Sequence, residues 1–150
     1  MELIDAVTDF SIEKDIVRPE YDVEFRISED REVFAWGRSL VPYQVYSALC
    51  CVAYTHEIPI NMNQLTEYSI NQSPYRGDIA VAYTVWNCSD TKGSGRSLIL
   101  ALQKHFSSHA KVNRLVTLSP LTEMAKRFHL SNGARLLSTN PESYNFEYGI

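Results

Sequence analysis

The sequence has no run of basic residues and little excess charge of either sign. Its 14 lysines and arginines are outnumbered by 18 aspartates and glutamates, which gives a net charge of −4 at pH 7. Proteins that bind nucleic acid or anionic membrane surfaces usually carry a clustered positive patch. We therefore expect neither of these two partners.

Cysteine is scarce, and long apolar runs are absent. The three cysteines, of which Cys50 and Cys51 are adjacent, cannot form a paired disulfide framework, and none has zinc-like spacing to histidine. No apolar run approaches the roughly 18 residues of a membrane span, and the first five residues lack the basic flank of a signal peptide. The sequence predicts a cytoplasmic protein without a bound metal.

What the sequence does have is enough apolar residues for a core. With 150 residues, 45% of them hydrophobic, and no internal repeat, residues 1–150 are expected to form one domain.

Periodicity predicts an α+β fold. Leu3, Ile4, Val7 and Phe10 recur at helical spacing, and residues 21–27 alternate apolar and charged side chains as in a strand with one solvated face. The remaining predicted elements are strands at 32–36, 45–54, 79–86, 112–118, 135–138 and 144–148, and helices at 60–70, at 96–106 and from Pro120 to Asn132-Gly133. This order is typical of a mixed sheet covered by helices.

A strand, a glycine loop and a helix in succession predict an anion site. The loop at 87–95 contains Gly93-Ser94-Gly95, flanked by Lys92 and Arg96, and the next helix begins directly after it. Unpaired N–H groups and the helix dipole favour phosphate at such a place. An ordinary surface turn is the alternative, because a lone Gly-x-Gly is weak evidence.

Four stretches make the sequence resemble a known superfamily. They lie at 34–36 with 52–59, at 83–87, at 115–120 and at 128–136. The chain resembles the Gcn5-related N-acetyltransferase superfamily, in which such a glycine loop holds the pyrophosphate of coenzyme A. Its closer likeness is to the malonyl-CoA decarboxylase branch, through Leu118-Ser119-Pro120 and the Phe128–Ala134 stretch above all.

The resemblance implies a fold and a set of site residues. The fold is a mixed, mostly antiparallel sheet flanked by helices. The family's serine and histidine fall on Ser119 and His129, a strand hydroxyl falls on Thr84, and a C-terminal tyrosine falls on Tyr148. The coenzyme loop falls on Lys92, Gly93, Ser94, Gly95 and Arg96. The chain lacks the family's N-terminal helical bundle, its loop glutamate and part of its segment between the serine and the histidine.

Each of these residues also has a purely structural interpretation. Ser119 can cap the helix that follows it, and His129 can be a core or surface residue. Thr84 and Tyr148 can be packing residues in strands. His56, His105 and His109 show no partner pattern, and Trp36 and Trp86 are most simply core residues.

The resemblance implies loss of CO2 from a malonyl-type thioester through an enolate. Ser119 would position the carboxylate, Thr84 or Ser119 would help to bind the enolate oxygen, and His129, alone or through Tyr148, would supply the proton. The substrate would be an acyl-CoA or an acyl carrier protein, and no cofactor is expected beyond its CoA or phosphopantetheine part. Two alternatives are an acyltransferase with an amine acceptor and a non-catalytic acyl-thioester-binding module. The sequence leaves the oligomeric state open.

Overall fold

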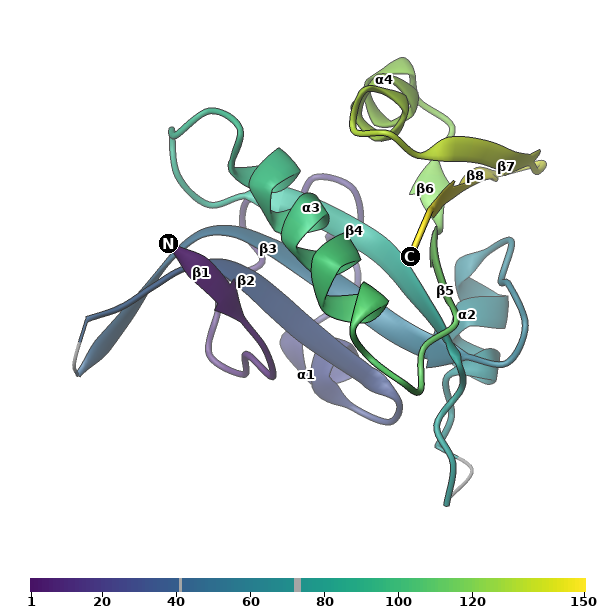
Figure 1. The fold of residues 1–150 in the computed structure, drawn as a ribbon, viewed down its shortest axis with the longest axis horizontal. Coiled ribbons are helices and arrows are strands. Elements are labelled where there is room, and N and C mark those ends of the chain that lie inside the picture. Colours follow the sequence, from purple (N-terminus) through teal and green to yellow (C-terminus); the bar gives the residue numbers. More distant parts are fainter. Residues whose placement is uncertain (41, 72–73) are drawn as a thin grey trace.

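The fold is built on one twisted sheet with helices on both of its faces (Figure 1). The computed structural model describes residues 1–40, 42–71 and 74–150. The strands are β1 (Glu2–Ile4), β2 (Arg31–Leu40), β3 (Tyr43–Thr55), β4 (Ile79–Asn87), β5 (Arg114–Thr117), β6 (Ser119–Pro120), β7 (Arg135–Thr139) and β8 (Ser143–Tyr148). The helices are α1 (Val23–Ile27), α2 (Met62–Tyr68), α3 (Ser94–Ser107) and α4 (Glu123–Ser131).

The strands run in the order β1-β2-β3-β4-β5-β8-β6, and β7 pairs with β8. Among the described strands only β4 and β5 pair in parallel, and the other pairs are antiparallel. The sheet is thus mixed and mostly antiparallel, as the resemblance implied.

The central strands are buried on both faces, which explains their nearly continuous apolar sequence. Cys50 packs in the cluster on one face of β3, and Cys51 packs in the cluster on the other face. Both thiols are free and fully buried, so both cysteines act as small core residues.

Different elements cover the two faces. Helix α3 lies across β2, β3 and β4 in Figure 1 and buries Leu98, Leu102 and Phe106 against them. The other face is covered by the segment before α1, by α1 and by α2, whose Leu65 is fully buried. No helix in the described part of the chain is both long and apolar enough to cross a membrane.

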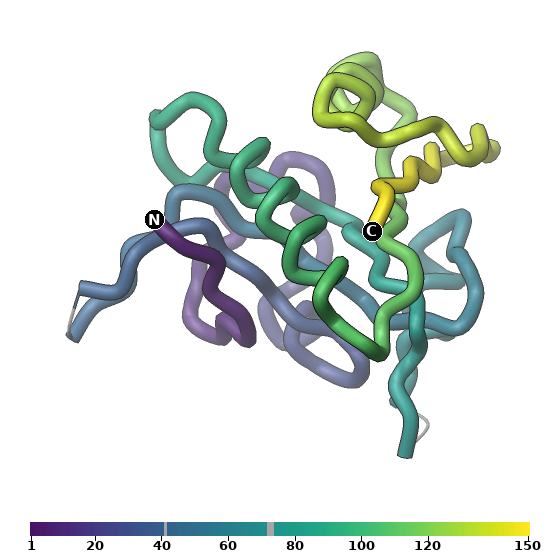
Figure 2. Tube along the Cα trace, viewed as in Figure 1, coloured from purple at the N-terminus to yellow at the C-terminus, as the bar shows by residue number. Residues whose placement is uncertain are grey.

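The parallel pair β4 and β5 separates after four residue pairs. Ile79 to Ala82 pair with Arg114 to Thr117, and one further bond joins the Leu118 N–H to the Ala82 carbonyl at 2.9 Å. Beyond it the chain turns away from β4, and β6 continues the pairing with β8 that β5 began. Figure 2 shows the resulting C-terminal unit, made of β6, β7, β8 and α4, standing apart from the end of β4.

Two predictions for the N-terminal region were wrong. Residues 3–10 do not form a helix, because Leu3 and Ile4 pair with Trp36 and Ala35 as the edge strand β1. Residues 21–27 do not form a strand, because the Asp22 side chain accepts a hydrogen bond from the Phe25 N–H and starts the short helix α1.

The ends of α4 confirm one prediction and correct another. Pro120 lies in β6 and does not open the helix, which begins at Glu123 after Thr122 accepts a hydrogen bond from the Ala125 N–H. Ser119 is therefore not its cap. The helix ends as expected at Asn132 and Gly133, where Gly133 has a φ of 94° that favours glycine.

Candidate functional site

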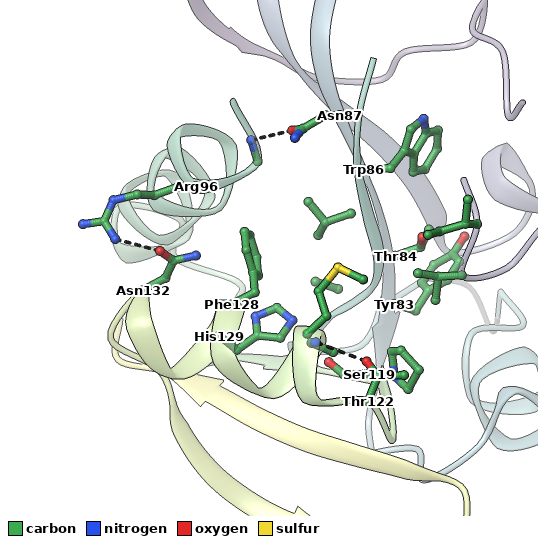
Figure 3. Close-up of a pocket in the computed structure, with 18 of the residues that line it drawn as sticks. Tyr83, Thr84, Trp86, Asn87, Arg96, Ser119, Thr122, Phe128, His129 and Asn132 are labelled. Atoms are coloured by element: carbon green, nitrogen blue, oxygen red, sulfur yellow. Dashed lines mark hydrogen bonds between the residues drawn. The ribbon is translucent and has the colours of Figure 1, made fainter. Parts of the chain in front are cut away.

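A cavity of about 650 Å³ lies where β4 and β5 separate (Figure 3). Its walls come from β4, the start of α3, β6, α4 and the segment before α1. Among the predicted residues, those that line it are Thr84, Gly93, Gly95, Arg96, Ser119 and His129. The serine and the histidine, 10 positions apart in the sequence, thus face the same space.

The glycine loop forms one end of the cavity. Gly93 has a φ of 83° and precedes the first residue of α3, and a side chain built on it would meet no atom within 4 Å. The Gly95 N–H donates to the Asn87 Oδ1 at 3.0 Å, which fixes the loop to the end of β4. The first-turn N–H groups of a helix have no partner within the helix, so this end offers donors to an anion.

Two predicted loop residues do not line the cavity. Lys92 is exposed beside the loop. Ser94 is buried and donates its hydroxyl hydrogen to the Thr91 carbonyl at 3.1 Å, so its side chain stabilises the loop itself.

His129 projects from α4 between Phe128 and Phe146. Its ring centroid lies 5.2 Å from that of Phe146, and the residue is only 6% exposed. This burial lowers the pKa of the imidazole to about 4, so the ring is neutral at pH 7. Its Nδ1 lies 2.7 Å from the Tyr148 hydroxyl.

Tyr148 does not line the cavity and lies between His129 and a second polar pair. Burial raises the pKa of its phenol, while the side-chain amide of Asn132 and the charge of Arg96 act in the opposite direction. The Asn132 Nδ2 is itself buried without a hydrogen-bond partner in the described structure. The Arg96 guanidinium in turn donates to the Asn132 Oδ1 at 2.8 Å, as Figure 3 shows. Polar groups therefore lie between the glycine loop and the imidazole, although no hydrogen bond of the described structure joins Asn132 to Tyr148.

Ser119 lies in β6 beside the N-terminal end of α4, lines the cavity and is 3% exposed. Its Oγ is 2.8 Å from the Thr117 Oγ1, which also accepts the Phe146 N–H at 3.1 Å. When the Thr117 hydroxyl donates to Ser119, the Ser119 hydrogen remains available to a ligand.

Thr84 faces the cavity, but its hydroxyl is already used. It donates to the buried Asp15 Oδ1 at 3.0 Å. Asp15 also forms a salt bridge of 2.6 Å with Arg26, and both side chains are fully buried. The Thr84 hydroxyl is therefore held by this pair and does not point a free hydrogen at a ligand.

The sequence analysis missed several lining residues. Asn132 lay inside the Phe128–Ala134 stretch but was interpreted only as a helix end, and Met124 gave no signal at all. Lys14, Ile16 and Val17 come from a segment that resembled no known family. These residues follow no recognisable spacing in the sequence and share no chemical type. Only the fold brings them together.

The lowered pKa of His129 predicts how the free energy of unfolding depends on pH. Because the folded protein holds this histidine neutral down to about pH 4, whereas the unfolded chain protonates it near pH 6.5, unfolding takes up a proton between these values. The free energy of unfolding should therefore fall as the pH is lowered from 6.5 to 4, by up to about 3 kcal/mol from this residue. Urea titrations of the parent and of His129→Gln measure it.

The glutamine variant should lose most of that pH dependence. Parallel curves for the two proteins across this pH range would show that His129 is not buried as a neutral ring.

Comparisons with known proteins give matches of structure but not of sequence. No family model matches the chain, and neither does any curated protein sequence. Malonyl-CoA decarboxylase from Agrobacterium vitis superposes with a TM-score of 0.67 and 17% identity, over 93% of this chain and 56% of that protein. The enzyme from Rhodopseudomonas palustris gives 0.64 and 18%, with the same coverage. The chain thus spans little more than half the length of these two proteins.

An acetyltransferase structure matches over more of its own length. Arabidopsis thaliana NAA60, in complex with a bisubstrate analogue, gives a TM-score of 0.56 and 16% identity, over 87% of this chain and 84% of that protein. Identities this low establish the fold and not the activity. The chain has the Gcn5-related N-acetyltransferase fold, in the form that malonyl-CoA decarboxylases also adopt.

Proposed function

We propose that this protein removes CO2 from a malonyl-type thioester carried by CoA or by a carrier protein. The observation that carries the proposal is the lining of the cavity. Ser119 and His129 both line it, Lys14 and Arg96 contribute positive charge, and no aspartate or glutamate of the described chain lines it. Such a site favours an anionic substrate and offers a hydroxyl and an imidazole to it.

The first step breaks the bond between the carboxylate and the α-carbon. Its electron pair moves into the thioester and forms an enolate, so the thioester is itself the electron acceptor. Ser119 orients the carboxylate. Along the edge of β4 beyond Ala82, where the described chain provides no partner strand, backbone N–H groups are available to the enolate oxygen. Because the Thr84 hydroxyl donates to Asp15, we assign Thr84 to fixing this edge.

The second step protonates the α-carbon. With the Tyr148 hydroxyl donating to Nδ1, the proton of the neutral imidazole is on Nε2. Transfer of that proton to carbon, with transfer of the tyrosine proton to Nδ1, leaves a neutral imidazole and a phenolate. Burial disfavours this phenolate, and the amide of Asn132 and the charge of Arg96 offset part of that cost. A proton from water then restores the tyrosine.

Ser119→Ala tests the carboxylate assignment. The variant removes one hydroxyl that acts on the reacting group, so we expect decarboxylation of malonyl-CoA to fall about 10- to 100-fold, the range for a lost hydrogen bond to a charged group. Ser107→Ala, on the exposed end of α3, is the matched control and should retain the parent rate. A Ser119 variant with the rate of the control would remove Ser119 from the mechanism.

Acyl transfer is the second candidate. It is favoured by the match to an acetyltransferase structure over most of that chain's length. It requires a base for the amine acceptor, and the described lining of the cavity supplies no carboxylate, so water would have to relay the proton. A binding module without turnover is the third candidate, since the loop and cavity alone can hold a thioester.

One experiment separates the three candidates. The protein is incubated with malonyl-, methylmalonyl- and acetyl-CoA, with and without amines, and the products are identified by mass spectrometry. Loss of one CO2 without an amine supports the decarboxylase. Acetyl transfer that depends on an amine would replace it with the transferase, and unchanged thioesters would leave a binding module.

A further inference from the structure

Arg18 joins β4 to the start of β6 at the point where the strands separate. Its Nε donates to the Tyr83 carbonyl at 2.9 Å, and its Nη2 donates to the Leu118 carbonyl at 3.0 Å. The last backbone hydrogen bond between the two segments joins the Leu118 N–H to the Ala82 carbonyl. The guanidinium bridges the two segments at the next position, where no backbone hydrogen bond of the described chain joins them. It satisfies two carbonyls that the separation would otherwise leave unpaired.

The two carbonyls belong to the residues that precede Thr84 and Ser119. Holding them fixes the backbone from which both hydroxyl side chains project. Arg18 itself is not among the lining residues, but Ile16 and Val17, its neighbours in the chain, form part of the wall. The guanidinium therefore lies behind the part of the cavity wall that carries Thr84 and Ser119.

The charge of Arg18 has no carboxylate partner within salt-bridge distance in the described chain. Asp15 lies near it but is paired with Arg26, so among the buried groups of this cluster there are two guanidinium groups and one carboxylate. Glu20 and the phenols of Tyr21 and Tyr83 also face Arg18, and Glu20 is exposed to solvent. Burial lowers the pKa of Arg18, yet an arginine stays charged at neutral pH.

We infer that Arg18 is a positioning residue that makes the cavity select a carboxylated acyl group over a neutral one. It does so in two ways: by fixing the backbone before Thr84 and Ser119, and by placing a positive charge that has no salt-bridge partner in the described chain behind the wall from which these two side chains project. The inference rests on the proposed function, because the selected group is the carboxylate that this reaction removes.

The test compares one anionic and one neutral thioester. Sulfoacetyl-CoA has the negative charge of malonyl-CoA but no CO2 to lose, and acetyl-CoA has no charge on its acyl group. Binding of each to the full chain is measured by calorimetry for the parent, Arg18→Gln and Arg18→Lys. Arg38→Gln, which removes one exposed positive charge on β2, is the matched control.

We expect Arg18→Gln to weaken binding of sulfoacetyl-CoA about tenfold, equivalent to about 1.4 kcal/mol, and to change binding of acetyl-CoA less than twofold. Arg18→Lys retains the positive charge but not the two guanidinium N–H donors that hold the Tyr83 and Leu118 carbonyls. It should therefore keep the ratio of the two affinities, while turnover of malonyl-CoA falls. Equal weakening of both ligands in the glutamine variant would overturn the inference. If circular dichroism shows that the glutamine variant does not fold, the lysine variant decides. Equal affinities of Arg18→Lys for sulfoacetyl-CoA and acetyl-CoA would then overturn the inference.

Failure of the inference is distinguishable from failure of the proposed function. A parent protein that binds sulfoacetyl-CoA selectively but releases no CO2 from malonyl-CoA would refute the decarboxylase alone. A parent that decarboxylates, with selectivity unchanged in Arg18→Gln, would refute the role of Arg18 alone.

Discussion

Replacing His129 with alanine is expected to lower the rate of malonyl-CoA decarboxylation at least 100-fold. A positioned acid contributes about 10²- to 10⁴-fold, and the described lining of the cavity includes no second imidazole or carboxylate that could replace it. Tyr148 cannot act directly, because it lies behind the histidine and reaches the cavity only through Nδ1. The rate is measured as CO2 release under single-turnover conditions, which separates the chemical step from product release.

The binding of acetyl-CoA should be unchanged in this variant, since the glycine loop, which we propose holds the CoA, lies at the other end of the cavity. His56→Ala is the control, because it removes an exposed imidazole outside the cavity. Tyr148→Phe adds a second readout: if the tyrosine relays the proton, its loss should reduce the rate and reduce it no further when His129 is already alanine. A rate of His129→Ala within about threefold of the parent would exclude His129 as the proton donor.

The middle of the fold was predictable because its local signals agree with its packing. From β4 to the end of α4, strand periodicity, the glycine loop and the Asn132-Gly133 stop occur in the order in which the structure uses them. The likeness to malonyl-CoA decarboxylase also indicated Ser119 and His129, which both line the cavity. Helical or strand periodicity alone would have assigned them to packing. A segment can be predicted from its sequence when its local structural preference agrees with its tertiary contacts.

The N-terminal region was not predictable because tertiary contacts override its local pattern. Arg26 falls on the charged side of an alternating stretch, which predicts a solvated face, yet it is fully buried. Its burial depends on Asp15, 11 residues earlier in an irregular segment, and on the carbonyls of Arg18 and Tyr21. No pattern of residue spacing in the sequence predicts that these groups bind Arg26.

The same reason explains the missed parts of the site. Arg18 acts on two backbone carbonyls that are 35 residues apart, at Tyr83 and Leu118, and backbone groups leave no trace in the sequence. Asn132 acquires its role only because Arg96, on a different helix, reaches its side-chain oxygen. The sequence thus indicated two side chains that line the cavity, Ser119 and His129, whereas the groups that orient them depend on the fold.

Replacing Arg26 with methionine is expected to lower the free energy of unfolding by about 3 to 5 kcal/mol, a large part of the 5 to 15 kcal/mol typical of a domain. Methionine fills much of the space but leaves the Asp15 carboxylate buried without its partner at 2.6 Å. It also leaves two carbonyls without the donors that Arg26 provides. Urea unfolding of both proteins at pH 7 measures the difference.

The double variant Asp15→Asn, Arg26→Met separates the cost of an unpaired charge from that of lost packing. Asparagine keeps an oxygen for the Thr84 hydroxyl and for the Val17 N–H, but it carries no charge to bury. The double variant should therefore be more stable than Arg26→Met, although Asp15→Asn also removes one member of the pair. Arg135→Met, which breaks an exposed salt bridge to Glu147, is the control and should cost less than about 1 kcal/mol. A double variant no more stable than Arg26→Met would mean that lost packing and hydrogen bonds, not the stranded carboxylate, make Arg26 necessary for the wall that carries Thr84.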